Sequence, residues 1–332
     1  MPQPPSPASP AVDDPVVAAA RAVLEEHART FNLAGAFLPD GCRDDAAVVY
    51  AFCRLVDDAV DEAPSIPAGR AALASITAEL RGEAPARPLI AGLRGLAAAR
   101  GIDLRVFEEL IAGVASDAGE VALHSDAELV RYCYRVAGTV GLMMCGVMGI
   151  DDPAALPFAV DLGLGMQITN ICRDVAEDAE RGRIYLPAAR LRAAGVDPAT
   201  VLAGTVDRRL LARVIDDLLG LAERYYASAD RGMRYIPARS RLAIFIASRV
   251  YRAIGRRLQR RGASDPMRGR TVVPAPAKAR WIAAAVGAFA RRSRDPGAPH
   301  DPWLHRDLVG LPGIDPQASR LGERLLDPEN AG

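Results

Sequence analysis

Residues 170–187 read NICRDVAEDAERGRIYLP, and this stretch decides how the rest of the chain is interpreted. In a helix, Asn170, Asp174 and Asp178 lie four residues apart and share one face. Gln167 extends the same row, and its apolar surroundings predict a mostly buried helix. A buried row of acceptor side chains is costly without a compensating cation. Because Mg²⁺ prefers oxygen ligands and often shares them with substrate phosphates, the row predicts a cation and phosphate site.

A second acidic pair occurs in residues 50–62, which read YAFCRLVDDAVDE. Asp57 and Asp61 are again four residues apart, with Asp58 beside them and apolar residues around them. Either pair alone also fits a solvated acidic face neutralised by neighbouring arginines. Two such helices facing each other across a cavity would instead hold a small cluster of Mg²⁺ or Mn²⁺ ions, and the ions would hold a diphosphate.

Composition excludes several classes of protein. The chain has 332 residues and a formal net charge of zero, which argues against a nucleic-acid binder held by a basic surface. Its five cysteines form no C-x-x-C pair and suit a reducing cytosol. The four histidines lack zinc-ligand spacing, and no dinucleotide or P-loop fingerprint occurs. Without a signal peptide or an uncharged apolar run of about 18 residues, we expect a cytoplasmic protein with no membrane-spanning helix.

Helical periodicity dominates the chain and predicts an all-α fold. We expect a disordered tail over residues 1–16, one all-α domain over 17–293 and a Pro/Gly-rich C-terminal tail over 294–332. The expected helices share apolar residues at spacings of three and four. They cover residues 42–62, three segments between 66 and 120 broken at 82–88 and 100–101, 126–149, a helix opened by Pro153, 207–230 and 237–261.

Glycine is unusually frequent in the expected helix 126–149. Gly138, Gly141, Gly146 and Gly149 each cost about 1 kcal/mol in a helix interior. Such a cost indicates either a break in the helix or a close approach by another segment.

The two acidic motifs and their surroundings resemble the squalene/phytoene synthase family, and bacterial phytoene synthases most. The resemblance covers roughly residues 25–290. It is carried by Arg54–Asp61, Tyr132–Met144, Gln167–Asp178 and Gly182–Pro187. It implies the isoprenoid-synthase fold, a helical bundle around a central apolar cavity whose mouth carries both motifs.

The resemblance also implies roles for individual residues. The expected catalytic residues are Asp57, Asp61, Asp174, Asp178 and Tyr132. The expected metal set is Asp57, Asp58, Asp61, Asn170, Asp174 and Asp178. The expected substrate-binding residues are Arg29, Thr30, Phe31, Arg54, Gln167, Asn170, Arg173, Arg183, Tyr185, Tyr251, Arg270 and Lys278.

Several of these residues also have an interpretation without a role in binding. Without the resemblance, Arg270 and Lys278 would be interpreted as surface cations, and Arg183 as a solvated arginine in a loop. Arg173 also suits a salt bridge to a neighbouring carboxylate such as Glu177. Asp117 matches a family aspartate that faces the cavity. The sequence departs from the family pattern just after it, at Gly119, Ala122 and Leu123.

The implied reaction is a Mg²⁺-dependent head-to-head (1′–1) condensation of two prenyl diphosphates. Geranylgeranyl diphosphate would give phytoene through a cyclopropyl (prephytoene) diphosphate. Farnesyl diphosphate would give dehydrosqualene, squalene or presqualene diphosphate.

A non-catalytic helical assembly factor would be expected to lose motif carboxylates. A terpene cyclase usually has Ser or Thr and Glu where this chain has Asp174 and Asp178. The lipid substrate and product suggest peripheral contact with the inner membrane.

Overall fold

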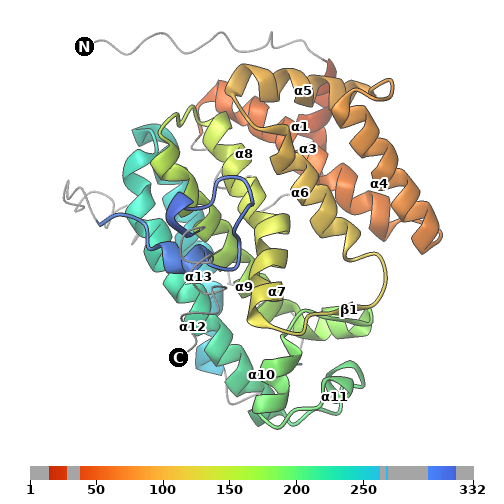
Figure 1. The fold of residues 1–332 in the computed structure, drawn as a ribbon, viewed down its shortest axis with the longest axis vertical. Helices are drawn as coiled ribbons and strands as arrows, with labels where there is room; N and C mark the ends of the chain where they lie inside the picture. The colour runs from red at the N-terminus through yellow and green to blue at the C-terminus, as the bar shows by residue number, and fades with distance from the viewer. Residues whose placement is uncertain (1–14, 28–37, 262–266, 268–297, 319–332) are drawn as a thin grey trace, which may run out of the picture.

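Helix α9, Leu156–Glu180, is the central element of the fold, and α8, α12 and α13 pack around it (Figure 1). The computed structural model describes residues 15–27, 38–261, 267 and 298–318. The all-α expectation is confirmed for these residues, since the strands are two residues long. The elements in chain order are α1 Pro15–His27, α3 Asp40–Asp61, α4 Ile66–Arg81, α5 Pro88–Arg100, α6 Leu104–Ala115, β1 Val121–Ala122, α7 Asp126–Cys133, η1 Tyr134–Gly138, α8 Thr139–Val147, η2 Pro153–Ala155, α9, β2 Arg183–Ile184, α10 Ala188–Ala193, α11 Pro198–Leu202, α12 Arg208–Gly232, η3 Met233–Tyr235, α13 Ala238–Arg261 and η4 Pro302–His305.

The segment Pro153–Glu180 is long and apolar enough to cross a membrane by length and composition alone. However, 67% of its most apolar window is buried inside the bundle. Burial against other helices is the ordinary reason for such a composition in a core helix. The apolar character of α9 is thus accounted for by its place in the bundle.

The N-terminal part of the bundle holds α3 in place beside α4, α5 and α6. Phe52 of α3 is fully buried and meets Phe107 of α6 edge-on, with ring centroids 5.4 Å apart. The expected breaks after α4 and α5 occur at Gly82 and Gly101, which adopt φ values of 79° and 63°. These left-handed residues end each helix, because glycine adopts that conformation without steric cost.

The expected helix 126–149 is interrupted by a π-helical turn, η1, at Tyr134–Gly138. Its glycines also allow close packing. A Cβ at Gly141 would lie 2.4 Å from the carbonyl oxygen of Ala159, and one at Gly163 would lie 2.4 Å from that of Ala137. Both expected explanations therefore hold here: the helix is broken, and its backbone packs directly on α9.

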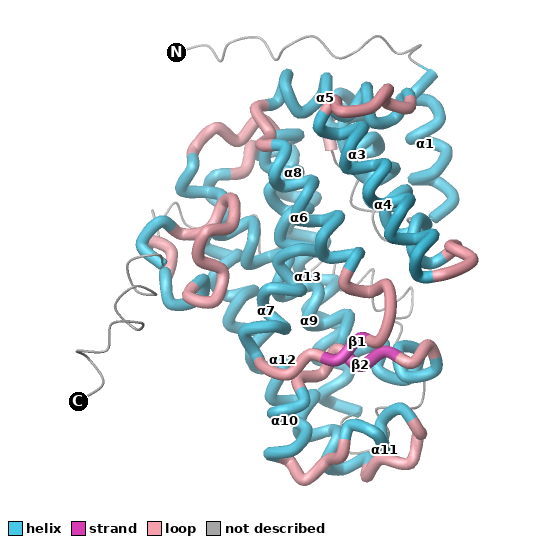
Figure 2. The backbone as a smooth tube through the Cα atoms, turned by 45° about the vertical axis from the view of Figure 1, so that its right-hand side comes forward, coloured by secondary structure: helices cyan, strands magenta, loops and turns pink. Residues whose placement is uncertain are grey.

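The strands β1 and β2 pair in parallel, Val121 opposite Arg183 and Ala122 opposite Ile184 (Figure 2). The pairing continues through the backbone, since the N–H of Ala188 donates to the carbonyl of Leu123 at 2.9 Å. These contacts fix the chain around Arg183 by main-chain groups. Ala122 and Leu123, two of the positions that depart from the family pattern, thus contact the segment that contains Arg183 through backbone atoms.

Part of the expected C-terminal tail is folded, which differs from the boundary predicted at residue 294. Residues 298–318 lie against the bundle beside α8 and α9 (Figure 1). Leu308 and Ala318 are fully buried, and the Tyr134 hydroxyl donates to the carbonyl of Pro312 at 2.7 Å. The sequence did not predict this folded segment, because it is rich in proline, glycine and charged residues and contains no long helix with regular apolar spacing.

Candidate active site

The two acidic motifs come together around Arg183. The Arg183 guanidinium donates to Asp61 Oδ1 at 3.2 Å, from β2 to the last turn of α3. Arg183 also lies close enough to Asp178, at the end of α9, to lower the pKa of that carboxyl. The end of α3 and the end of α9 therefore border one charged mouth, although they are over 100 residues apart in the chain.

Two carboxylates of this mouth lack a partner among the described residues: neither Asp57 nor Asp178 has a side-chain hydrogen bond or salt bridge there. Burial and the neighbouring Asp174 charge raise the pKa of Asp178 to about 7, against the opposing effect of Arg181 and Arg183. Asp57 is exposed at the mouth. Even so, loss of hydration from the protein around it, with the charge of Asp61, raises the pKa of Asp57 to about 7. A cation between the motifs would favour the ionised form of both groups.

Other motif carboxylates are already paired. Arg54 donates from Nε to Asp58 Oδ2 at 3.1 Å, one helical turn away. Arg173 holds Asp174 with two hydrogen bonds, one of them 2.7 Å from Nε to Oδ1. The sequence allowed Arg173 a salt bridge to a neighbouring carboxylate such as Glu177, and in the structure the carboxylate that it pairs with is Asp174. A cation at Asp174 would share that carboxylate with Arg173.

Asp117 joins this mouth although it stood outside the predicted metal and substrate sets. Tyr132 donates to its Oδ2 at 2.9 Å, and Tyr132 stacks on Tyr185 with ring centroids 4.9 Å apart. Burial raises the pKa of Asp117 to about 6, while the Tyr132 hydrogen bond and the charge of Arg183 oppose the shift. Tyr132 and Tyr185 thus lie at the charged mouth.

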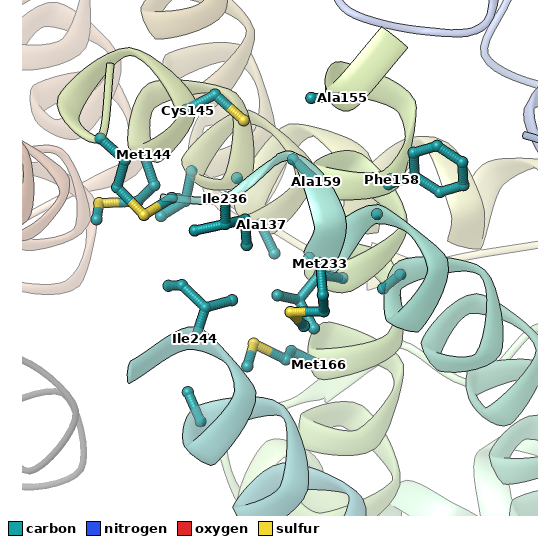
Figure 3. Close-up of a pocket in the computed structure, with 18 of the residues that line it drawn as sticks. Ala137, Met144, Cys145, Ala155, Phe158, Ala159, Met166, Met233, Ile236 and Ile244 are labelled. Atoms are coloured by element: carbon teal, nitrogen blue, oxygen red, sulfur yellow. The ribbon is translucent and has the colours of Figure 1, made fainter. Parts of the chain in front are cut away.

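An apolar cavity of about 280 Å³ lies next to this mouth (Figure 3). Gln167, Asn170 and Tyr251 line it, as predicted substrate-binding residues would. Small and medium-sized apolar side chains form most of its wall. Those labelled in Figure 3 are Ala137, Met144, Cys145, Ala155, Phe158, Ala159, Met166, Met233, Ile236 and Ile244.

The cavity follows one face of α9 from Asn170 back to Phe158. Twelve residues of helix correspond to about 18 Å at the usual helical rise. The wall opposite comes from η1 and α8, where Val136 to Met148 line it, and from α13. A long hydrocarbon chain fits such a dry track, with its polar end at Asn170.

The mouth suits a hard divalent cation. Asn170 donates from Nδ2 to Gln167 Oε1 at 3.3 Å, and its buried Oδ1 accepts no hydrogen bond from any described residue. A buried carbonyl oxygen without a partner is costly unless a donor or cation fills the place. Together with Asp57 and Asp178, which have no partner in the part of the chain that the structure describes, it offers the oxygen donors that Mg²⁺ prefers.

A second cluster of polar side chains, the Asp161 carboxylate with the imidazoles of His300 and His305, has possible ligand atoms within 4.8 Å of one another. The N–H of Asp315 donates to His305 Nδ1 at 3.1 Å, which leaves Nε2 of that ring protonated. A protonated nitrogen donates to Asp161 and does not ligate a metal. Asp161 also lies 13 residues before Asp174 on α9, about 20 Å along the helix. This cluster is therefore separate from the mouth.

Comparison with known proteins agrees with this geometry. A sequence profile of the squalene/phytoene synthase family matches residues 24–277. The chain is 37% identical to a 15-cis-phytoene synthase of Enterobacter agglomerans, over 80% of this chain and 92% of that protein.

The chain belongs to the squalene/phytoene synthase family.

Further members agree with this placement. The chain is 38% identical to a 15-cis-phytoene synthase of Paracoccus sp., over 83% of this chain and 92% of that protein. A dehydrosqualene synthase solved with a ligand superposes with a TM-score of 0.74 at 25% identity, over 83% of this chain and 97% of that one. As a member of this family, the chain is a prenyltransferase.

Five predicted substrate-binding residues lie outside the described residues: Arg29, Thr30, Phe31, Arg270 and Lys278. Of the others, Asp61, Asp178, Arg183, Tyr132 and Tyr185 lie at the mouth, and Gln167, Asn170 and Tyr251 line the cavity. Their roles in binding and catalysis stay predictions.

Proposed function

We propose that the protein joins two geranylgeranyl diphosphates head to head to give phytoene, in a Mg²⁺-dependent reaction. The observation that carries the proposal is an apolar cavity that runs from a mouth with unpaired carboxylates, in a chain 37% identical to a 15-cis-phytoene synthase. The C1–O bond of one donor breaks, and C1 bonds to the C2–C3 double bond of the other. Loss of a proton closes a cyclopropane. The second diphosphate then leaves, the carbon skeleton rearranges, and a second proton is lost.

Asp57, Asp178 and Asn170 would hold the divalent ions, with Asp61 and Asp174 beside them. When bound, Mg²⁺ neutralises the diphosphate and makes it a better leaving group. Arg183 and Arg54 place guanidinium groups at the same mouth, where they bind diphosphate oxygens.

The apolar cavity protects the allylic cation that remains after the diphosphate departs. Met166, Phe158 and Ile244 offer it no nucleophilic oxygen, so the cation reacts with a carbon–carbon double bond and water stays out. At the mouth, the pair Tyr132–Asp117 can hold a proton that the hydrocarbon loses, because the phenol oxygen and the carboxylate lie 2.9 Å apart.

A farnesyl-using synthase is the second candidate. The observation that favours it is the fold match to a dehydrosqualene synthase at 25% identity, with a TM-score of 0.74. The chemistry at the mouth would be the same, and only the length of hydrocarbon along α9 would differ.

The decisive experiment incubates the purified full chain with Mg²⁺ and each donor separately, and identifies the extracted hydrocarbon by mass spectrometry. We expect phytoene from geranylgeranyl diphosphate and no product when EDTA is present. A 30-carbon product from farnesyl diphosphate, with none from the longer donor, would favour the second candidate. No hydrocarbon from either donor would overturn both.

We also propose peripheral contact with a membrane, since substrate and product are lipids. Flotation of the purified protein with liposomes checks this. The protein should move with the vesicles and be released by alkaline carbonate, and recovery of all protein in the lipid-free fraction would contradict it.

A further inference from the structure

Residues 298–318, here called the C-terminal strap, bind several elements that surround the cavity. Tyr134 of η1 donates to the carbonyl of Pro312 at 2.7 Å, and Tyr225 of α12 donates to that of Leu304 at 3.2 Å. The side chain of Leu142 on α8 fills the space beside Gly313, where a Cβ would lie 2.3 Å away. The strap therefore joins η1, α8 and α12 from outside.

The strap is fastened to α9 by a buried network of two histidines and two aspartates. His300 bridges two carboxylates, with Nε2 3.0 Å from Asp161 Oδ2 and Nδ1 2.8 Å from Asp315 Oδ2. His305 Nε2 lies 3.0 Å from Asp161 Oδ1. Asp161 and His305 are fully buried, and the His300 side chain is 4% exposed.

The contacts determine the protonation of each ring. Both nitrogens of His300 face carboxylate oxygens, so both carry protons and the ring is an imidazolium. His305 accepts the Asp315 N–H at Nδ1 and is neutral. With His300 protonated the network has a net charge of −1. With His300 neutral, the charge is −2, and one ring nitrogen without a proton faces a carboxylate.

The network also contacts the far end of the apolar cavity. The His300 ring meets Phe158 edge-on, with centroids 5.3 Å apart, and Phe158 lines the cavity (Figure 3). Phe158 in turn stacks on Tyr235 at 5.9 Å and packs on Gly232, and both of these also line the cavity. His300 is therefore one side chain away from the space in which a hydrocarbon tail would end.

We infer that the C-terminal strap is a pH-sensitive latch: His300, as an imidazolium between Asp161 and Asp315, holds the strap on α9 and so positions Phe158 at the far end of the cavity. The stability of the latch does not depend on the proposed reaction, whereas its effect on substrate use rests on the proposed function. In this role His300 is a positioning residue that does not touch the substrate.

Several other ionisable or charged groups surround the network. Arg231 of α12 donates to the carbonyl of Pro299 at 3.4 Å. Arg231 and Arg234 each lie 5.9 Å from the Phe158 ring centroid. The groups that face the network from α9, α12, η3 and the strap are Asp161, Tyr225, Arg231, Arg234, Tyr235, His305 and Asp315.

The direction of the pH effect follows from the charges. Burial by itself lowers the pKa of His300, but the hydrogen bonds and charges of Asp161 and Asp315 outweigh it, and the pKa is raised above its ordinary value. A group whose pKa is raised on folding stabilises the fold fully below its ordinary pKa of about 6.5. That stabilisation is lost as pH rises through the raised value.

The test compares the thermal unfolding of the full-length wild type with His300→Gln between pH 5.5 and 9. We expect His300→Gln to lower the melting temperature by roughly 3 °C or more at pH 6, and by clearly less at pH 9. The matched control is His124→Gln, at an exposed position, which should follow the wild type at every pH. An equal decrease at all pH values would overturn the latch, as would no decrease.

Asp315→Asn tests the same point if His300→Gln fails to fold. It removes one negative partner of His300 and keeps the shape, so the pH at which wild-type stability declines should move downward. An unchanged profile would overturn the proposal. A rise in wild-type melting temperature with Zn²⁺ alone, absent in His300→Gln, would assign the cluster to a metal and overturn it too.

Substrate use separates the latch from the proposed reaction. At pH 6, His300→Gln should raise the KM for geranylgeranyl diphosphate about threefold, with little change in kcat, because the tail end of the cavity is altered and the mouth is intact. If the wild type makes no hydrocarbon, the proposed function fails and the thermal test still decides the latch. If the wild type is active and the variant shows an unchanged KM, the positioning of Phe158 fails alone.

Discussion

Helix α9 carries acidic side chains near both ends, and their charges are compensated to different degrees. At its start, Asp161 is fully buried and accepts hydrogen bonds from His300 and His305. The surrounding histidines lower the pKa of Asp161, although burial alone would raise it. At its end, Asp178 has no hydrogen-bond partner among the described residues, and its pKa is raised to about 7.

The difference lies in how each charge is compensated. The Asp161 carboxylate has hydrogen-bond donors on both oxygens, so it stabilises the fold, and removing a donor would leave a buried charge uncompensated. Neighbouring carboxylates that repel one another cost stability, and such a cost is typical of sites that bind a ligand. The same residue type on one helix is therefore in two different environments, set by its neighbours.

The largest expected effect is on activity at the mouth. Asp57→Asn and Asp178→Asn should each reduce hydrocarbon formation roughly 1,000-fold, since each removes a charged oxygen donor for the metal–diphosphate complex. The melting temperature should stay the same or rise slightly, because repulsion between carboxylates is relieved. Thermal shift with Mg²⁺ and inorganic pyrophosphate provides a second measurement, and the stabilisation seen in the wild type should shrink in both variants.

The control for these variants is Asp151→Asn, an exposed aspartate outside both clusters. It should keep full activity and the full thermal shift. Wild-type turnover by Asp57→Asn would contradict the metal assignment.

The next effect is on stability at the other cluster. Asp161→Asn leaves His300 and His305 without their shared carboxylate, and we expect the free energy of unfolding to fall by roughly 3 kcal/mol. Denaturant unfolding measures the change. Activity per folded molecule should remain within a fewfold of the wild type, because the mouth is about 20 Å away. If Asp161→Asn stabilised the protein, the contrast between the clusters would be lost.

A smaller effect is expected from a substitution near the start of α9, in the wall of the cavity. Ala159→Phe adds a ring to the track near Phe158, so it should lower use of geranylgeranyl relative to farnesyl diphosphate by about tenfold. Competition between the two donors, read by mass spectrometry, gives the ratio. Ala98→Phe, on the exposed side of α5, is the matched control. Equal loss with both donors would mean that Ala159 affects the mouth and not the length of the tail.

The smallest expected effect concerns two buried tyrosines, Tyr132 at the mouth and Tyr225 beside the C-terminal strap. The Tyr132 hydrogen bond lowers the pKa of Asp117, so Tyr132→Phe should raise that pKa above about 6. If the Asp117 carboxylate assists the reaction, activity should fall roughly threefold at pH 6.5 and recover by pH 8.5. Tyr225→Phe, which removes a hydrogen bond to the strap, should change stability and leave the pH–rate profile unaltered.

Much of the fold could be predicted because its signals are local. The glycines that end α4 and α5 and the spacing of apolar residues in α9 and α12 each act within a few residues. The pairs Asp57–Asp61 and Asp174–Asp178 indicated the mouth for the same reason, since a one-turn spacing is visible in a sequence.

The rest depended on contacts between distant segments. Nothing near Asp161 in the sequence indicates that His300 and His305, more than 130 residues later, would surround it. The sequence indicated that Arg173 could pair with a neighbouring carboxylate such as Glu177 but not which one, and packing decides for Asp174. The π-helical turn at Tyr134–Gly138 packs closely on Gly163 of α9, a contact that the sequence around the turn does not show.

The short pairing of β1 with β2 has a consequence for how this enzyme can change over evolutionary time. Main-chain hydrogen bonds, which every residue except proline supplies, hold the segment that carries Arg183. The exposed side chain at Ala122 can therefore vary while the Arg183 guanidinium keeps its place, and Leu123 needs only an apolar side chain that packs on the core. Sequence variation at these two positions would therefore say little about how strongly selection maintains the position of Arg183.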